Sequence, residues 1–302
     1  MQQFEGTILA GEGFGPVRGR VVINDGQITA VEETATDSTD IVLPAFVNAH
    51  THIGDSVAKE AGVGLSLDAA VAPPDSEKHR RLAAASRDEL ITAMRRTLQL
   101  MEETGTVAHL DFRESGEPGT EALRTAASET ATDAVIFGSG PASVLNLADG
   151  YGASGANDDE FTDERAAARK ANKPFAIHAG EPDATDIHPA LDYEPELLVH
   201  MVHAEAEHLE RVADQAVPVA VCPRANAVLD VGRPPIRGLL DHTTVALGTY
   251  NVMLNSPSMF REMAFTTKTY DVSDREVLRM ATQAGAEIAD LNCGVIEPGR
   301  RA

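Results

Sequence analysis

Lysine is scarce in this chain, cysteine is nearly missing, and no long apolar run occurs. Only five of the 25 basic residues are lysines, and 47 aspartates and glutamates outnumber all of them, which gives a formal net charge of −22. A surface of this charge repels phosphate backbones, so we expect no nucleic acid as a partner. Because no stretch of about 18 apolar residues is present, we predict no membrane span. Residues 1–5 lack the basic start and apolar block of a signal peptide, which makes the cytoplasm the expected location.

The only cysteines are Cys222 and Cys293, and the Cys-x-x-Cys spacing of a structural zinc site does not occur. Two thiols in 302 residues do not make a disulfide framework. The many carboxylates are spread along the chain instead of forming one acidic block. We interpret them as a solvated surface suited to a halophilic, high-salt cell interior, where dissolved ions screen the self-repulsion. This prediction concerns habitat and leaves the chemistry open.

The pattern of apolar runs predicts a small β module followed by a barrel. Residues 4–42 read as short strands, and Asp25-Gly26 between two β-rich runs predicts a hairpin. From residue 47 onward, strand-like runs alternate with helical patterns. In the clearest of these, residues 86–104, Ser86 and Glu89 form a capping box. Eight runs are predicted as strands: 47–52, 107–112, 134–138, 143–147, 175–178, 197–202, 217–221 and 244–247. Eight β/α repeats predict a (β/α)8 TIM barrel with its active residues at the carboxyl ends of the strands.

Two long connections are candidate binding loops. Residues 54–82 carry Asp55 and the pair Pro73-Pro74, and residues 146–159 are rich in glycine and aspartate. Loops of this length in compact domains often bind ligands. For any single residue in them, a solvated connector is the alternative interpretation.

Four histidines stand at the ends of three predicted strands. His50 and His52 end the first strand, and residues i and i+2 of a strand point to the same face. His178 ends the fifth strand, and His200 lies in the sixth. Because the carboxyl ends of barrel strands meet at one mouth, these side chains are expected to converge. Neutral imidazoles are common ligands of zinc and similar ions, so we predict a bound metal there; a structural role is the alternative for any one of these histidines.

Five motifs run through most of the chain in a fixed order. They are Leu43-Pro44-Ala45-Phe46-Val47-Asn48-Ala49-His50-Thr51-His52, His178-x-x-Glu181, His200-Met201-Val202-His203, Cys222-Pro223-Arg224-Ala225-Asn226 and Leu247-Gly248-Thr249. Together they resemble the amidohydrolase superfamily, especially its cytosine, guanine and adenosine deaminase and chlorohydrolase branch. The resemblance implies that residues 1–43 belong to a small flanking β-sandwich and residues 44–290 to a metal-dependent hydrolase barrel. Residues 291–302 would return toward the β domain.

The resemblance also implies roles for single residues. His50, His52 and His178 would bind one divalent metal ion, zinc or iron. Glu181 would carry a proton between the attacking water and the leaving nitrogen, and His200 would hold or polarise that water. General chemistry agrees, because a bound cation lowers the pKa of its water to about 7 and a nearby carboxylate can protonate a departing amine. The predicted activity is hydrolysis of a C–N bond other than a peptide bond, by deamination of a small cyclic amidine or a nucleobase- or nucleoside-like substrate.

Asp55 and Arg113 are tentative substrate-binding residues, because they lie just past the first and second predicted strands. For Arg113, an ordinary surface ion pair with Glu114 is an equal alternative. Asp55 has a second interpretation, as a substitute for a carboxylate that the family pattern has elsewhere and this chain lacks.

That missing carboxylate is the first departure from the family pattern. After the eighth strand the pattern has Gly-Thr-Asp, whose aspartate is a metal ligand and general base, and this chain has Gly248-Thr249-Tyr250. A phenol has a pKa near 10 and is a poor base at neutral pH. Tyr250 therefore opens an alternative function, in which a catalytically impaired relative keeps the barrel and acts as a binding or assembly protein.

The second departure is at the end of the chain. Residues 294–302 resemble the point where the family's chain re-enters the β domain, and here the chain stops. The flanking sandwich is then expected to lack its C-terminal strands and to have an open edge. A second subunit could cover that edge, so a homo-oligomer is one alternative. A metal-free sugar or phosphate barrel is disfavoured, because no glycine-rich phosphate loop follows the late strands.

Overall fold

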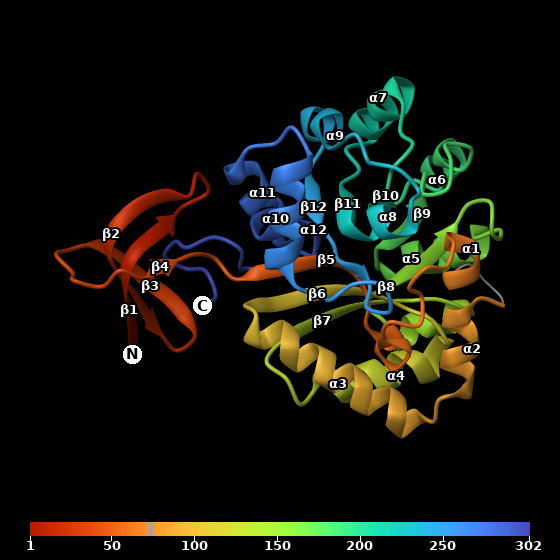
Figure 1. Cartoon of the computed structure of the whole chain (residues 1–302), viewed down its shortest axis with the longest axis horizontal. Helices are drawn as coiled ribbons and strands as arrows, with labels where there is room; N and C mark the ends of the chain where they lie inside the picture. Colours follow the sequence, from red (N-terminus) through yellow and green to blue (C-terminus); the bar gives the residue numbers. More distant parts are fainter. Residues whose placement is uncertain (72–74) are drawn as a thin grey trace.

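The computed structural model describes residues 1–71 and 75–302. Most of them belong to a barrel, in which a curled sheet of parallel strands is surrounded by helices (Figure 1). The strands are β5 (Phe46–His52), β6 (Thr106–Arg113), β7 (Asp133–Gly138), β8 (Gly150–Gly155), β9 (Phe175–Ala179), β10 (Leu197–His200), β11 (Val219–Val221), β12 (Val245–Leu247) and β13 (Tyr250–Asn251). Each pairs in parallel with its neighbours, in chain order from β5 to β12. The predicted TIM barrel is confirmed.

The ring closes at a seam between the last strand and the first. Only Gly248 and Thr249 separate β12 from β13, and β13 pairs in parallel with β5. At the seam, the side-chain amide of Asn48 donates to Thr249 Oγ1 at 2.7 Å, and the backbone N–H of Thr249 donates to Asn48 Oδ1 at 3.0 Å. A Cβ on Gly248 would lie 2.7 Å from the Cβ of His50, so this position requires glycine.

Helices surround the barrel (Figure 1). They are α3 (Arg87–Glu103), α4 (Gly116–Ala127), α5 (Thr162–Ala171), α6 (Ile187–Asp192), α7 (Ala206–Gln215), α8 (Pro223–Leu229), α9 (Ile236–His242), α10 (Met259–Thr269), α11 (Asp274–Ala281) and α12 (Gln283–Ile288). The predicted helix at residues 86–104 is confirmed as α3, with both hydrogen bonds of the Ser86–Glu89 capping box. Its residues Ile91, Met94, Leu98 and Met101 are buried.

The prediction of the fourth strand is wrong. Residues 143–147 fall in and just after the 3-10 helix η2 (Ala142–Asn146), and the fourth strand is β8, which runs through the segment predicted as the second binding loop. Glycine has a low strand propensity, and β8 reads Gly-Tyr-Gly-Ala-Ser-Gly. A Cβ on Gly150 would lie 2.7 Å from the ring of Phe137, and one on Gly152 would lie 2.8 Å from the ring of Phe112. These glycines make room for two phenylalanine rings.

The first long connection is largely helical. It contains the 3-10 helix η1 (Ile53–Ala58), α1 (Leu67–Ala70) and α2 (Glu77–Ala84), and α2 packs against η1. The pair Pro73-Pro74 lies outside the described residues. In the described part of the chain, no helix combines the length and the apolar character needed to cross a membrane.

A separate four-stranded sheet precedes the barrel (Figure 1). Its strands are β1 (Gln2–Ala10), β2 (Gly15–Asn24), β3 (Gln27–Glu33) and β4 (Ile41–Val42), in the order β3-β2-β1-β4. The predicted hairpin joins β2 to β3, with positive φ at Asp25 (49°) and Gly26 (75°). Near the C-terminus, Ile296 is buried with Ile8, Val21 and Ile28 of this sheet. The domain limits at residues 43 and 290 stay predictions.

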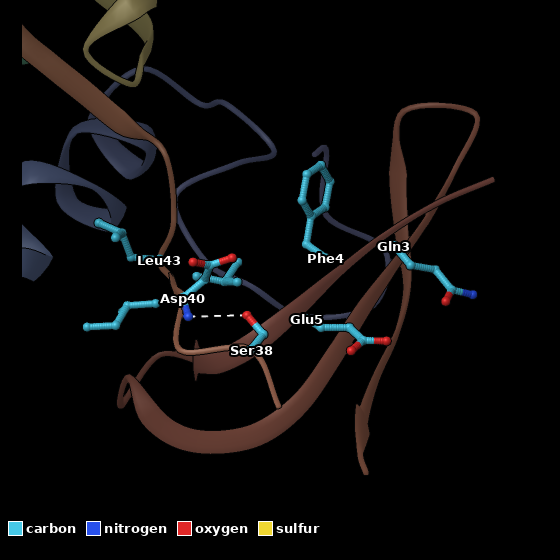
Figure 2. Close-up of a pocket in the computed structure, with 8 residues that line it drawn as sticks. Gln3, Phe4, Glu5, Ser38, Asp40 and Leu43 are labelled. Carbon is cyan, nitrogen blue, oxygen red and sulfur yellow. Dashed lines mark hydrogen bonds between the residues drawn. The ribbon is translucent and has the colours of Figure 1, made fainter. Parts of the chain in front are cut away.

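A surface pocket lies beside β1 and β4, on the small sheet. It is lined by Gln3, Phe4, Glu5, Ser38, Asp40, Ile41, Val42 and Leu43. Figure 2 shows the backbone N–H of Asp40 donating to Ser38 Oγ, at 3.2 Å. None of these residues is among those predicted to carry chemistry, so the pocket has no part in the site described next.

Candidate active site

Four histidines from three strands lie together at the carboxyl ends of β5, β9 and β10. His50 and His52 come from β5, His178 from β9, and His200 is the last residue of β10. The ring centroid of His50 lies 4.9 Å from that of His52, 4.9 Å from that of His178 and 5.7 Å from that of His200. One ligand atom each from His50, His52 and His178 can be chosen so that all three lie within 4.8 Å of one another. The predicted convergence of the strand tips is therefore present.

A hydrogen bond fixes the proton on one of these imidazoles, and a carboxylate lies beside a second. His178 Nδ1 lies 2.9 Å from the carbonyl oxygen of Ala153, which can only accept, so Nδ1 carries the proton and Nε2 keeps a lone pair. His52 Nδ1 lies 2.9 Å from Glu114 Oε1, and its Nε2 is buried without a partner. Such carbonyl and carboxylate partners are usual behind metal-binding histidines.

The protonation states of the three imidazoles suit a cation. Burial lowers the pKa of His52 to about 3 and also lowers the pKa of His50 and His178, so all three rings are neutral at pH 7. Nε2 of His178 lies 3.3 Å from Nε2 of His50. A positive ion held between these nitrogens would satisfy lone pairs that are buried from water. The donor set fits zinc or iron, which accept imidazole nitrogen.

Glu181 and His200 lie beside the three imidazoles. Gly180, with φ of 66°, turns the chain after β9, and a Cβ there would lie 2.7 Å from Ile187 Cδ1. This turn brings Glu181 Oε2 to 3.5 Å from His200 Nε2. Burial raises the pKa of Glu181 to about 8, and its Oε1 has no partner. Asn226 Nδ2 lies 3.3 Å from His200 Nδ1, which leaves the other nitrogen of His200 to face Glu181.

Tyr250 lies among the histidines, in β13 opposite Thr51. It is buried, with a positive φ of 59°. Its ring stacks on His50 at 5.5 Å between centroids and meets His200 edge-on at 4.7 Å. Its hydroxyl lies 3.5 Å from Glu181 Oε2. Burial raises the pKa of Tyr250 well above 10, so the phenol stays protonated at neutral pH.

Asp55 and Arg113 are buried behind His52. The exposed fraction of Arg113 is 3% and that of Asp55 is 0%. The ion pair of Arg113 with Glu114 that we considered is present, but the Arg113 guanidinium is buried and not on the surface. Arg113 Nη2 donates to Glu114 Oε2 at 2.5 Å in a partly buried position. A Cβ on Gly54 would clash with the Arg113 guanidinium, so this glycine makes the space for it. Asp55 forms a separate group of ligand atoms with His52 and Glu114.

Sequence reasoning missed two residues that contact this cluster. Lys78 of α2 is buried, and its Nζ contacts Glu114 and lies 3.3 Å from Asp55 Oδ2. Phe112 of β6 lies edge-on to His50 at 4.5 Å between centroids. Phe112 could have been identified from the sequence. Successive side chains of a strand point to opposite faces, and Phe112 lies near the end of β6 on the face opposite to that of its two neighbours. No local signal marks Lys78.

Comparisons with known proteins agree on one family. Residues 41–302 match the model of the Amidohydrolase family. A provisionally named aminohydrolase of Methanothermobacter thermautotrophicus is 35% identical over 97% of this chain and 88% of its own length. The solved structure of a guanine deaminase from C. acetobutylicum with bound guanine has a TM-score of 0.78 at 16% identity, over 99% of this chain and 89% of that one. Atrazine chlorohydrolase TrzN from Arthrobacter aurescens TC1, complexed with zinc, has a TM-score of 0.80 at 18% identity, over 100% and 86%. The two solved structures show the shared fold.

Proposed function

The chain belongs to the amidohydrolase family, and we propose that it is a metal-dependent hydrolase that deaminates a small cyclic amidine or a nucleobase- or nucleoside-like molecule. The observation that carries the proposal is the convergence of His50, His52 and His178, neutral and buried, on one point. In this proposal they bind one zinc or iron ion. A neighbouring fold whose solved structure holds guanine supports the substrate class.

The ion would supply a water of lowered pKa, near 7 in favourable sites. The chain's own residues are proposed to transfer the proton and to orient the water. A carboxyl group whose pKa lies near the working pH can both take and give a proton, and the pKa of Glu181 is about 8. Glu181 is therefore proposed to hold the proton destined for the leaving nitrogen. His200 Nε2, 3.5 Å from that carboxyl group, is proposed to orient the attacking water.

The burial of the site bears on the size of the proposed substrate. His50 and His200 are 0% exposed, His52 5% and Glu181 7%, which favours a small molecule as the proposed substrate. Asp55 and Arg113 are also buried, and their role in substrate binding stays a prediction from the sequence. The cytoplasmic location, the high-salt habitat and the homo-oligomer stay predictions from the sequence.

The proposal is tested by metal analysis and an ammonia-release screen on purines, pyrimidines and their nucleosides. We expect the purified protein to hold about one zinc or iron per chain and to release ammonia from at least one compound. His178→Ala is expected to lose the ion. A wild-type protein that binds no added zinc or iron would contradict the proposal.

Tyr250 favours a second candidate function, a binding or assembly protein. A phenol whose pKa is held above 10 cannot act as the general base that an aspartate would provide. The Tyr250→Asp variant separates the cases in the same screen. Ammonia release by the variant alone would indicate a decayed enzyme. Bound metal without release by either protein would favour the binding or assembly role.

A further inference from the structure

The Nδ1 side of His52 faces a buried cluster of charged groups. Nζ of Lys78 lies 3.3 Å from Asp55 Oδ2 and contacts Glu114 Oε1, while Arg113 Nη2 donates to the other oxygen of Glu114 at 2.5 Å. The exposed fraction of Lys78 is 4%. Both oxygens of Glu114 are thus held by cations. The Glu114 side chain keeps an exposed fraction of 21%, so its position depends on these contacts with two cations.

The two neighbours of His52 Nδ1 demand opposite tautomers. Glu114 Oε1 lies 2.9 Å away and Lys78 Nζ lies 3.3 Å away. A carboxylate accepts from Nδ1–H and leaves the lone pair on Nε2, where the ring can bind an ion. An ammonium group donates to Nδ1 and leaves the proton on Nε2, where the ring cannot. The shorter contact belongs to Glu114, so the arrangement selects the metal-binding tautomer.

Lys78 reaches this cluster from a different element. It belongs to α2, which packs against η1, the 3-10 helix that directly follows β5. Its ammonium group lies between the side chains of His52, Asp55 and Glu114, and its contact with Glu114 holds that carboxylate against the imidazole.

We propose that Glu114 and Lys78 are positioning residues for His52, an inference that rests on the function proposed above. Glu114 fixes the proton of His52 on Nδ1, and Lys78 keeps Glu114 in place, so that Nε2 of His52 presents its lone pair to the ion. Neither residue touches the ion itself. When Glu114 is missing, the same Lys78 opposes metal binding, because it is then the group nearest to Nδ1.

The test measures zinc affinity of the full chain by competition with a chromophoric chelator. Outer partners of metal-binding histidines are typically worth 10- to 100-fold in affinity. We expect Glu114→Met to weaken zinc binding by about 100-fold and Lys78→Met by about tenfold. Glu114→Gln should weaken it less than Glu114→Met, because the amide oxygen still accepts from Nδ1. Arg80→Met is the matched control, since Arg80 lies in the same helix with a side chain that is 68% exposed, and it should leave the affinity unchanged.

The double variant Lys78→Met/Glu114→Met distinguishes this role from a general structural one. We expect it to bind zinc more tightly than Glu114→Met alone, because the competing ammonium group is gone. A merely structural role predicts that the double variant binds more weakly. Without Lys78, the ligand atoms of His52, Asp55 and Glu114 still lie within 4.8 Å of one another and could admit a second ion. Metal analysis therefore accompanies each titration, and affinities are compared for the first equivalent of zinc.

Two results would overturn the inference. One is that folded Lys78→Met and Glu114→Gln proteins bind zinc as tightly as the wild type. The other is that the double variant binds zinc more weakly than Glu114→Met. Thermal unfolding establishes which variants fold. If the Met variants at position 114 do not fold, Lys78→Met and Glu114→Gln decide the outcome. A wild-type chain that binds no zinc would instead refute the proposed function, so the two failures are distinguishable.

Discussion

The carboxyl group of Glu181 differs from an exposed glutamate because burial raises its pKa to about 8. We predict that Glu181→Gln lowers ammonia release by at least about 100-fold, since proton transfer by a positioned side chain contributes that much or more. The metal content should not change, because the amide keeps the shape of the side chain. Glu194→Gln, at an exposed glutamate, is the matched control and should keep the wild-type rate. A Glu181→Gln protein that keeps the wild-type rate would remove Glu181 from the mechanism.

Glu262 allows a pH effect on stability to be measured away from the histidines. It is 0% exposed, and its Oε1 accepts from the backbone N–H of Arg224 at 2.9 Å. Burial raises its pKa from 4.5 to about 7, although the Arg224 guanidinium lies beside it. The folded state therefore prefers the neutral carboxyl group. This stability is complete below the unfolded pKa and is lost as the pH rises through 7.

We predict that Glu262→Gln, which is neutral at every pH, loses less stability than the wild type between pH 5 and pH 8. Each unit of difference between the folded and unfolded pKa is worth about 1.4 kcal/mol. Urea unfolding of both proteins at the two pH values measures the effect. Equal losses in the two proteins would show that Glu262 is ionised without cost in the folded state.

At the residue scale, the sequence predicts side chains whose position follows from strand parity and strand ends. His50, His52 and His178 are of this kind, and they lie together in the structure. Lys78 could not be predicted, because it lies 26 residues after His52 in a helix and reaches the site only when α2 packs against η1. The burial of Arg113 depends on the missing side chain of Gly54, which no local pattern indicates.

At the element scale, α3 begins at a capping box that stabilises it independently of the core. Ser86 Oγ accepts from the backbone N–H of Glu89, and the Glu89 carboxylate accepts from the backbone N–H of Ser86. We predict that Ser86→Ala lowers the free energy of unfolding by about 1 kcal/mol. Glu103→Gln, at an exposed position in the last turn, should change it by less than about 0.5 kcal/mol. Chemical denaturation measures both, and equal effects would contradict a capping role.

Strand β8 links packing to the proposed chemistry. A Cβ on Gly152 would lie 2.8 Å from the ring of Phe112, which in turn packs edge-on against His50. We predict that Gly152→Ala lowers the free energy of unfolding by about 1–3 kcal/mol through overpacking. It should also weaken zinc binding, because Phe112 must move. Gly15→Ala in β2, where a Cβ would meet only Ala10 O at 3.9 Å, is the matched control. If the Gly152→Ala protein is destabilised but keeps its zinc affinity, the packing of Phe112 does not affect the proposed metal site.

The same strand shows where element prediction fails. Seven of the eight predicted barrel strands overlap strands of the structure, because apolar β-branched runs are buried on both faces of a parallel sheet. β8 consists half of glycine, since the rings of Phe137 and Phe112 occupy the space of its side chains. Residues 143–147 carry a strand-like apolar run and are mostly in η2, whose Val144 and Leu145 are buried in the core. Amino-acid composition therefore misleads strand prediction where a side chain from a neighbouring strand fills the space that a residue's own side chain would occupy.

At the scale of the whole molecule, the net charge of −22 predicts a stability that depends on salt. Salt shortens the screening length from about 10 Å at 0.1 M to about 3 Å at 1 M, so repulsion among exposed carboxylates weakens. We predict that the thermal unfolding midpoint rises as potassium chloride increases over this range. Sucrose solutions of matched osmolality are the control for excluded-solute effects. An unfolding midpoint that does not change with salt would remove the argument for a halophilic habitat.

The seam that closes the barrel has a consequence for how the protein is made. The hydrogen bonds between Asn48 and Thr249 join residues 201 positions apart, and contacts of this separation form late in folding. A growing chain on the ribosome therefore carries His50, His52 and His178 before Tyr250 can take its place beside them. The candidate site is therefore incomplete until the last barrel strand has emerged.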